Sequence, residues 1–428
     1  MMSHRFTDKK GRPVVVVTGM GLVTPLAWGK QDNWGALVEG RSGIKPISRF
    51  PTDGLRTTIA GTVTPENGCF SSAPELTIDM ARYAAQEALS EAGLADISGF
   101  PGPLFLATPP AELEWPQRQA LLDAEVAGGL TGYKRLLAAA RTGQFRSFFE
   151  NFQFSSVADH LCDAFQPRGL PVSVSTACAS GATAIQLAAE SIRRHETDIA
   201  LAVGTDSSVQ LEALIRFSLL SALSIRNEEP GAASRPFCKS RDGFVMAEGA
   251  AALVLETRSS AIQRGAQILG VVRGCGEMAD DYHRTRSKPD GSAIIGAMRN
   301  ALADADAAPD EIDYVNAHGT STPENDKMEY LSLQTVLGKK NLEATPVSST
   351  KSMTGHTLSA AGAIEAVLSL MMIGAATLLP TINYDDPDPE IPMDVVPNAA
   401  RKAPVRTVLS NSFGFGGQNA ALVIGTPD

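Results

Sequence analysis

The sequence is poor in cysteine and histidine, and it contains no long run of a single charge. Its five cysteines are scattered and no two form a CxxC pair, so neither a disulfide framework nor a structural zinc site is predicted. The net charge of -10 argues against a nucleic-acid surface, because binding phosphates requires an excess of basic residues. A small basic patch for an acidic partner is still compatible with this charge.

Segments that would carry the chain into or across a membrane are also missing. The start, MMSHRFTDKKGRP, is polar and charged and has no apolar core of a secretory signal. The longest apolar stretch, residues 366–379, is too short to span a bilayer and predicts a buried helix. We therefore expect a cytoplasmic protein without stable membrane association.

Short apolar strands alternate with alanine-rich helices along the chain. VVVVTGMG at 14–21 predicts a buried strand that runs into a glycine turn, and residues 77–93 predict a helix. With 43% hydrophobic and 20% charged residues, the composition is that of an ordinary globular protein. This pattern favours an α/β architecture with helices covering the sheets.

Two parts of the chain resemble each other. The segments that start at Ala81 and at Ile295 each contain an alanine-rich helix, a short acidic connector and an apolar strand. GVVRGCGE at 270–277 is similar in the same way to VVVVTGMG at 14–21. Two related halves packed about a pseudo-twofold axis would explain these echoes, and so would chance similarity between alanine-rich helices.

Cys178 lies where an alternating strand pattern passes into a helical one, in PVSVSTACASGATAIQ from Pro171. A helix N-terminus offers free N–H groups and the positive end of a dipole, so we expect a lowered thiol pKa and a nucleophilic thiolate. The small residues that follow Cys178 leave room for a substrate beside the sulfur. Taken alone, the segment is equally compatible with a buried structural cysteine, the commonest fate of a free thiol.

Two of the six histidines lie in loops of small residues next to apolar segments. His318 belongs to NAHGTST, which also holds Thr320 and Thr322, and Lys351 and His356 belong to STKSMTGH. Each feature alone has a plain structural explanation, and only their combination indicates a catalytic site. No GxGxxG fingerprint, P-loop or serine nucleophile elbow competes with them.

Taken together, these residues resemble the beta-ketoacyl synthases of the thiolase superfamily. The matching motifs, in chain order, are VVVTGMGLVTP, TACASG, SRPFCKSRDGFVMAEGA, NAHGTST, STKSMTGH and NSFGFGGQN. The resemblance covers nearly the whole chain. It implies a thiolase-like α/β fold of two pseudo-twofold halves in alternating helix and mixed-sheet layers. The N-terminal half, 13–265, would carry Cys178, and the C-terminal half, 266–425, the two histidines.

The activity that this resemblance implies is the decarboxylative Claisen condensation of fatty-acid elongation. An acyl group held on Cys178 would condense with malonyl-acyl-carrier protein to give 3-oxoacyl-acyl-carrier protein. His318 and His356 would donate hydrogen bonds to the malonyl thioester carbonyl, and the backbone N–H groups of Cys178 and Phe415 to the acyl carbonyl. Phe415 would gate the site, and Phe413 would bind substrate. Two histidines mark the elongating type, because initiating synthases use Cys-His-Asn.

The same resemblance assigns supporting residues and partners. Lys351 would pair with Glu329 and organise the histidines, while Thr320 and Thr322 would bind the pantetheine arm of acyl carrier protein. Neither a metal nor a cofactor beyond that arm is expected. The chain would form a homodimer, with the PVSVS strand near the two-fold axis.

Because carrier proteins are acidic, we expect basic residues at the mouth of the site. The candidates lie in predicted loops or element ends that flank the motifs: Arg49, Arg56, Lys134 and Arg135.

Residues 104–154 depart from the family pattern, because LFLATPPAELEWPQRQ stands where a glycine-rich GTxxGG turn is common. Five phenylalanines follow within ten positions: Phe145, Phe148, Phe149, Phe152 and Phe154. These rings would lengthen an acyl tunnel, plug a short one, or pack a dimer contact. We favour a longer tunnel and hence a preference for long acyl primers.

Three other functions compete with this interpretation. A condensing enzyme of polyketide or specialised lipid assembly would share all six motifs. A non-catalytic partner resembling chain-length factors would lack the active cysteine, whereas Cys178 is present. A cysteine hydrolase would need a Cys-His pair oriented by Asp or Asn, and the paired histidines argue against it.

Overall fold

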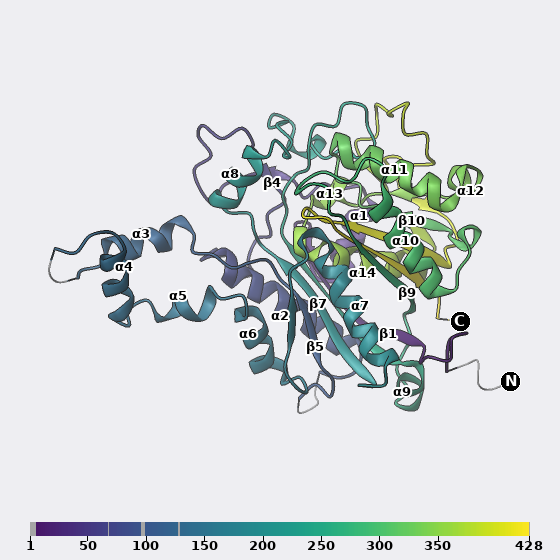
Figure 1. The fold of residues 1–428 in the computed structure, drawn as a ribbon, viewed down its shortest axis with the longest axis horizontal. Helices are drawn as coiled ribbons and strands as arrows, with labels where there is room; N and C mark the ends of the chain where they lie inside the picture. The colour runs from purple at the N-terminus through teal and green to yellow at the C-terminus, as the bar shows by residue number, and fades with distance from the viewer. Residues whose placement is uncertain (1–5, 67, 96–98, 127–128, 428) are drawn as a thin grey trace.

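The computed structural model describes residues 6–66, 68–95, 99–126 and 129–427. A mixed sheet forms the centre of its body (Figure 1). Ten of its strands form a single row in the order β11-β10-β14-β15-β9-β1-β8-β7-β5-β6, and the short β2 pairs with β1. The row divides at β1 and β9, which join through only Val16–Val271 and Val17–Gly270.

The five strands from β1 to β6 form one half of the row. In spatial order they are β1 (Val15–Thr24), β8 (Gly249–Thr257), β7 (Ile199–Asp206), β5 (Leu104–Ala107) and β6 (Val172–Val174). The first two neighbouring pairs are antiparallel and the last two are parallel. β6 is therefore an edge strand, with one side unpaired within the described chain.

The other five strands repeat the same plan. They are β9 (Gly270–Ala279), β15 (Gln418–Gly425), β14 (Thr407–Phe413), β10 (Tyr314–Asn316) and β11 (Val347–Ser348). Again the first two neighbouring pairs are antiparallel and the last two parallel. Because order and direction match strand for strand, the expected pair of related halves is confirmed. The exact limits, 13–265 and 266–425, stay predictions.

Glycines at matching positions of β1 and β9 explain the similarity of their sequences. A Cβ at Gly19 or Gly21 would lie about 2 Å from a carbonyl oxygen of α2 (Ala73–Glu91). A Cβ at Gly274 or Gly276 would lie 2.3 Å from a carbonyl oxygen of α10 (Ser292–Ala305). Only glycine lets each helix lie this close to its strand. The two GxG patterns are therefore explained by the same helix–strand contact in each half.

Two helices form the centre of the molecule. α7 (Ser180–Arg193) and α14 (Ala361–Ala375) pack against each other and contact strands of both halves. α14 is apolar on all sides because it is surrounded by protein, as predicted for this stretch. Within the described residues, Leu358–Ala375 is the one helical stretch long and apolar enough to cross a membrane, and 83% of it is buried in the fold.

Of residues 104–154, the first four are β5, and the helical part that follows forms an arm that projects away from the body (Figure 1). The arm contains α3 (Trp115–Asp123), α4 (Gly132–Arg141) and α5 (Arg146–Asn151), and α6 (Ser156–Phe165) returns the chain to α2. Residues 127–128 of this segment lie outside the described part. Two glutamates tie the root of the arm to the body. Glu112 accepts from Gln210 and Arg216, and Glu114 accepts from the backbone N–H of Ala73.

Shorter elements complete the fold. The helices are α1 (Lys30–Val38), α8 (Leu211–Leu219), α9 (Arg258–Gln263), α11 (Pro323–Leu337), α12 (Lys339–Ala344) and α13 (Lys351–Thr354). The strands are β2 (Ala27–Trp28), β3 (Lys45–Pro46), β4 (Ile59–Ala60), β12 (Thr377–Leu378) and β13 (Arg401–Lys402). The single turns of tighter helix are η2 (Ala177–Ala179), η3 (Pro230–Ala232), η4 (Pro309–Glu311) and η5 (Leu358–Ala360).

Candidate active site

Cys178 lies in the sharp turn between β6 and α7. Ala177 has a φ of 50°, a left-handed conformation that a residue with a Cβ adopts only under constraint from its surroundings. This turn brings Cys178 to the entrance of α7 and buries it to 8% exposure. The predicted junction of strand and helix is confirmed.

The second half repeats this turn and supplies the first histidine. His356 follows α13 and lies just before η5, where Leu358 has a φ of 47°. η5 leads into α14 as η2 leads into α7, so His356 and Cys178 come from matching turns, with Cys178 just after the left-handed residue and His356 two positions before it. His318 comes from the loop between β10 and α11.

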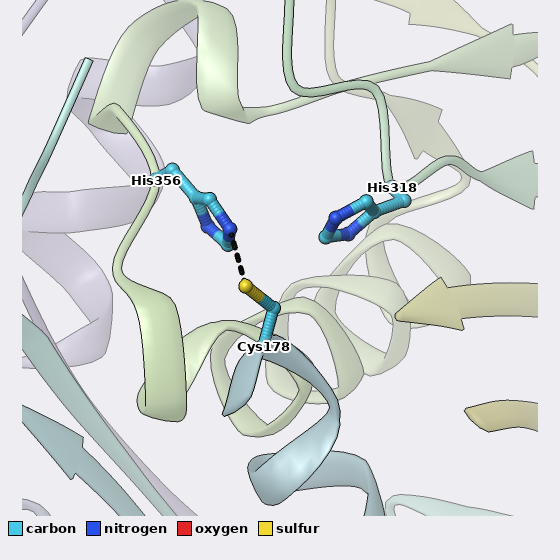
Figure 2. A group of neighbouring side chains, drawn as sticks. All are labelled: Cys178, His318 and His356. Atoms are coloured by element: carbon cyan, nitrogen blue, oxygen red, sulfur yellow. Dashed lines mark hydrogen bonds between the residues drawn. The ribbon is translucent and has the colours of Figure 1, made fainter. Parts of the chain in front are cut away.

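The three side chains converge on one point (Figure 2). Nε2 of His356 lies 3.0 Å from Sγ of Cys178. The rings of His318 and His356 have centroids 5.3 Å apart and stand nearly perpendicular, at 85°. Figure 2 shows the thiol directed at the ring of His356, with the ring of His318 on the other side of the site. The structure thus brings together the three residues that the sequence separates by up to 178 positions.

Burial sets the protonation of this cluster. It raises the pKa of the Cys178 thiol to about 11, although the Lys351 ammonium and the backbone N–H of Phe415 act in the opposite direction. Burial, and then the charge of Lys351, hold the pKa of both histidines well below the usual value. The resting site therefore contains a neutral thiol and two neutral imidazoles. The expectation of a lowered thiol pKa is wrong, because loss of solvent outweighs the helix entrance.

Lys351 has a different partner from the one expected. Its Nζ forms a short, buried ion pair with Glu365 on α14, not with Glu329. Each side chain is 3% exposed, and burial raises the pKa of Glu365 to about 7 even beside this ammonium. A carboxylate left alone in such surroundings would be costly, so the pair keeps both charges in place.

Glu329 instead holds the backbone of the His318 loop. Its two carboxylate oxygens accept from the N–H groups of His318 and Gly319, each at 2.8 Å, and Oε1 also accepts from Nδ2 of Asn411 at 3.1 Å. Gly319 has a φ of 38°, and a Cβ there would lie 2.5 Å from Ser349. Glu329 thus supports the site, as expected, but through the loop rather than through Lys351.

An aromatic wall of Phe217, Phe244 and Phe415 lies on the His356 side of the cluster. Phe415 packs with Phe217 of α8 and with Phe244, both at 6.5 Å between centroids, and Phe244 also stands edge-on to His356. Phe413 lies 5.5 Å from the ring of His318. The phenylalanines predicted from NSFGFGGQN are therefore beside the site, one at each end of the cluster.

The turn that carries Phe415 approaches the nucleophile closely. A Cβ on Gly414 would lie 3.0 Å from the carbonyl oxygen of Thr176 and 3.2 Å from the backbone nitrogen of Cys178. The backbone N–H of Phe415 acts on the thiol and favours its ionised form. The backbone of the Phe415 turn and that of Cys178 are therefore close neighbours, and their joint role as an acyl oxyanion site stays a prediction.

The two threonines of NAHGTST lie next to each other. Their hydroxyls are 2.9 Å apart, with Thr320 buried and Thr322 partly exposed at the start of α11. Such a pair offers two adjacent hydrogen-bonding groups beside His318.

The candidate docking residues do not all reach the surface. Arg49 is buried in an ion pair with Glu248, at 9% and 0% side-chain exposure, so its expected contact with a carrier protein is wrong. Arg56 is exposed and lines a small hollow with Ile225. Lys134 and Arg135 lie on α4 of the arm, away from the body (Figure 1).

The arm phenylalanines do not line a tunnel within one chain. Phe148 packs against Phe145 at 5.3 Å and Phe152 at 6.0 Å, while Phe149 is 71% exposed. Positions three and four apart on a helix meet each other, so these rings cluster in the arm. The apolar residues around Cys178 are different ones: Val209, Ala213, Leu214, Leu223, Phe244 and Leu358.

Sequence reasoning did not identify one residue of the site, Glu365. Glu365 is the single charge in the apolar segment LSAAGAIEAVLSL, and a buried acid in such surroundings must have a partner. This rule predicts a buried basic partner for Glu365, and Lys351 in the nearby STKSMTGH motif is a candidate.

Comparison with known proteins identifies the family. Residues 12–261 match the family described as "Beta-ketoacyl synthase, N-terminal domain", and residues 269–385 match "Beta-ketoacyl synthase, C-terminal domain". The chain belongs to the beta-ketoacyl synthase family. Its Cys-His-His cluster lies between the two matched parts, with Cys178 in the first and both histidines in the second.

Curated relatives carry names of fatty-acid elongation. A 3-oxoacyl-[acyl-carrier-protein] synthase 2 of Coxiella burnetii is 37% identical over 426 residues, which cover 96% of this chain and 98% of the relative. The namesake from Vibrio harveyi is 36% identical over 420 residues, covering 96% and 97%. The expected condensing acyltransferase of fatty-acid elongation is confirmed.

Solved structures match the fold over almost its whole length. A beta-ketoacyl synthase from Burkholderia phymatum has a TM-score of 0.82 at 32% identity and covers 96% of this chain and 99% of that one. A type II polyketide ketosynthase, solved with its acyl-carrier protein and bound to the hexaketide, has a TM-score of 0.85 at 32% identity, covering 97% and 100%. The expected thiolase-like fold is confirmed.

Proposed function

We propose that Cys178 holds the acyl group and that His318 and His356 activate malonyl-acyl-carrier protein for condensation with it. The observation that carries this assignment is the position of Sγ, 3.0 Å from Nε2 of His356 and within 4.8 Å of a ring nitrogen of His318. A carbon nucleophile generated beside the histidines would be next to the acyl carbonyl on the sulfur.

Acyl transfer onto Cys178 begins from a neutral thiol. As Sγ attacks the incoming thioester, its proton passes to Nε2 of His356, the base within hydrogen-bond reach. The N–H groups of Cys178 and Phe415 stabilise the oxyanion, and His356 then returns the proton to the departing pantetheine sulfur. The thioester is exchanged, and no redox partner is needed.

Condensation uses both imidazoles as donors. Once Sγ is acylated it no longer carries a proton, so Nε2 of His356 is free to carry one and donate it in a hydrogen bond. His318 donates from the other side to the same malonyl carbonyl, and carbon dioxide leaves as charge moves onto that oxygen. The resulting enolate attacks the acyl carbonyl, the product leaves on the carrier, and the released thiolate is reprotonated.

Lys351 and Glu365 keep the two imidazoles neutral donors. Burial, and then the ammonium, lowers the pKa of both histidines, and Glu365 is the buried counter-ion of that ammonium. Neutral imidazole suits this role, because an imidazolium would be costly in a site without solvent.

The pantetheine arm of the carrier is proposed to bind at Thr320 and Thr322, whose adjacent hydroxyls stand beside His318. The carrier itself would dock near Arg56, which is exposed at the hollow beside Ile225 and α8. α8 also supplies Phe217 of the aromatic wall, so this surface adjoins the His356 side of the site.

We infer a homodimer that joins through the edge strand β6, where Val172 is 40% exposed. A cytoplasmic location stays a prediction.

The test separates the two half-reactions with Cys178→Gln, whose amide imitates the acyl thioester. This variant should release carbon dioxide from malonyl-acyl-carrier protein but form no 3-oxoacyl product. Adding His318→Ala to it should lower decarboxylation by roughly 100- to 1,000-fold, the usual cost of losing one oxyanion donor. Cys69→Ala, a change at an exposed cysteine, is the matched control and should leave both steps intact. Condensation by Cys178→Gln, or unchanged decarboxylation in the double variant, would sink the assignment.

A second candidate is condensation in polyketide assembly. A tetracenomycin polyketide synthase ketoacyl synthase alpha subunit from Streptomyces glaucescens is 35% identical over 432 residues, covering 96% of this chain and 97% of the relative. The mass of the acyl group trapped on Cys178 in cells decides between the two: a saturated chain indicates fatty-acid elongation, and a chain with several carbonyls indicates polyketide assembly.

A further inference from the structure

The atoms at the centre of the site also form a set of donors suited to a metal ion. One ligand atom from each of Cys178, His318 and His356 lies within 4.8 Å of the other two, and all three residues are buried. A tetrahedral zinc site has Zn–S near 2.3 Å and Zn–N near 2.0–2.1 Å, which separates its donor atoms by about 3.3–3.6 Å. The Sγ–Nε2 spacing of 3.0 Å lies slightly below this value, and the other two spacings are at most 4.8 Å.

The chemistry of the three donors selects the kind of ion. One thiolate and two imidazoles suit borderline-soft divalent cations, whereas calcium and magnesium prefer oxygen. Three protein ligands with a fourth position open to water are a common coordination of protein-bound zinc. The Lys351 ammonium opposes a second cation nearby, but its charge is offset by the ion pair with Glu365.

We propose that Cys178, His318 and His356 form a binding site for a thiophilic divalent cation such as Zn²⁺, and that the bound ion inhibits acyl loading. On binding, the thiol releases its proton to solvent and the sulfur lone pair forms the metal bond. That lone pair is the one that attacks an acyl thioester, so the ion and the acyl group exclude each other. Occupancy by the metal depends on the geometry alone, while its effect on catalysis rests on the proposed function.

Titration of the full-length, reduced protein with Co²⁺ tests occupancy directly. One equivalent should produce the near-ultraviolet absorption of a cobalt–thiolate bond, and Zn²⁺ should abolish it by displacement. Cys178→Ser should lack the band, whereas Cys69→Ser should keep it. His318→Ala and His356→Ala should each weaken binding by ~10-fold or more, since each removes a ligand. A band that survives in Cys178→Ser, or none at saturating Co²⁺, overturns the proposal, with circular dichroism to verify that each variant is folded.

A second measurement tests the consequence. Zn²⁺ should slow both acyl loading and alkylation of Cys178 by iodoacetamide, and a chelator should restore them. Protein that already carries an acyl group should bind no Co²⁺ at this site. If the cobalt band forms but metal-free protein never loads an acyl group, the proposed function fails and the metal site stands. If acyl loading proceeds equally fast with saturating Zn²⁺, the inhibitory site is rejected.

Discussion

At the scale of single residues, the nucleophile is governed by burial rather than by its position at a helix entrance. Cys178 is shielded by the phenylalanines and by both histidines, and its ionised form loses more from missing solvent than it gains from Lys351 and Phe415. The thiol is consequently inert until a substrate arrives and His356 accepts its proton. Such a site keeps the sulfur protonated between turnovers.

Alkylation of Cys178 should therefore lack the plateau of a preformed thiolate. Because its pKa is raised to about 11 from an ordinary value near 9, the thiolate fraction at pH 7 should be ~100-fold smaller than in an unperturbed thiol. The rate with iodoacetamide, followed by peptide mass spectrometry, should rise steadily from pH 6 to pH 10. Cys69, which is exposed, provides an internal comparison. A rate that levels off below pH 8 would mean that the thiolate is already formed in the resting enzyme.

The pairing of Lys351 can be measured by double-mutant cycles. Glu365→Gln leaves a buried ammonium without its partner and should destabilise the protein by roughly 3–5 kcal/mol. Lys351→Met should lower the free energy of unfolding much less in the Glu365→Gln background than in wild type. The same cycle with Glu329→Gln should show little coupling to Lys351, because Glu329 binds the backbone of the His318 loop. Stronger coupling of Lys351 to Glu329 than to Glu365 would contradict the assignment.

At the scale of elements, the arm is attached to the body by two acidic residues at its root. Glu114 accepts from the N-terminus of α2 at 2.6 Å and precedes α3 directly. Burial raises its pKa to about 7, so the carboxyl is half protonated near neutral pH. The attachment of the arm is thus sensitive to pH near neutrality, a range in which most acidic side chains stay ionised.

Stability should fall between pH 5 and pH 8 partly because of Glu114. A carboxyl whose folded pKa is raised stabilises the folded state fully below the unfolded pKa, near 4.5, and loses that contribution as pH rises through about 7. Glu114→Gln should reduce the fall by at most about 3 kcal/mol, measured by denaturant unfolding at both pH values. Glu329 and Glu365 also have a pKa near 7 but are unchanged in the variant, so the difference isolates Glu114. An identical fall in both proteins would show that Glu114 does not titrate in this range.

At the scale of the whole molecule, the sheet is open at one end. β6 pairs with β5 on one side only within the described chain; its first residue, Val172, is 40% exposed, and Leu170 just before it is 89% exposed. The exposed rings of the arm add further apolar surface. An edge strand with apolar neighbours is a template for pairing with another copy, which is the basis for the proposed dimer. The preference for long acyl primers stays a prediction.

Val172→Lys should disrupt the dimer, because it places like charges on both copies of β6 where they meet. Light scattering should show the mass of one chain, near 45 kDa, where wild type shows two. Ile262→Lys is the matched control, since this residue is 41% exposed and belongs to α9, which packs against β1 and β8. A dimer that survives Val172→Lys, or a monomeric wild type, would reject β6 as the interface.

The sequence by itself determined the local chemistry of this protein. The turn into α7, the small residues beside Cys178, the glycines in NAHGTST and NSFGFGG, and the two GxG strands each follow from steric rules that act over a few residues. Order and spacing of the motifs were enough to identify the family. The matching openings at 14–21 and 270–277 also predicted two related halves, since each needs glycine where a helix lies on its strand.

The tertiary structure alone decided which residues meet and how they are charged. Lys351 could pair with either of two acids in the sequence, and only the packing of α13 against α14 selects Glu365. The direction of the Cys178 pKa depends on solvent exclusion by residues far away in the chain, which no local pattern encodes. Arg49 and the arm phenylalanines were misplaced for the same reason. Burial and ion pairing are properties of the assembled fold, whereas turn geometry and motif spacing are properties of the chain.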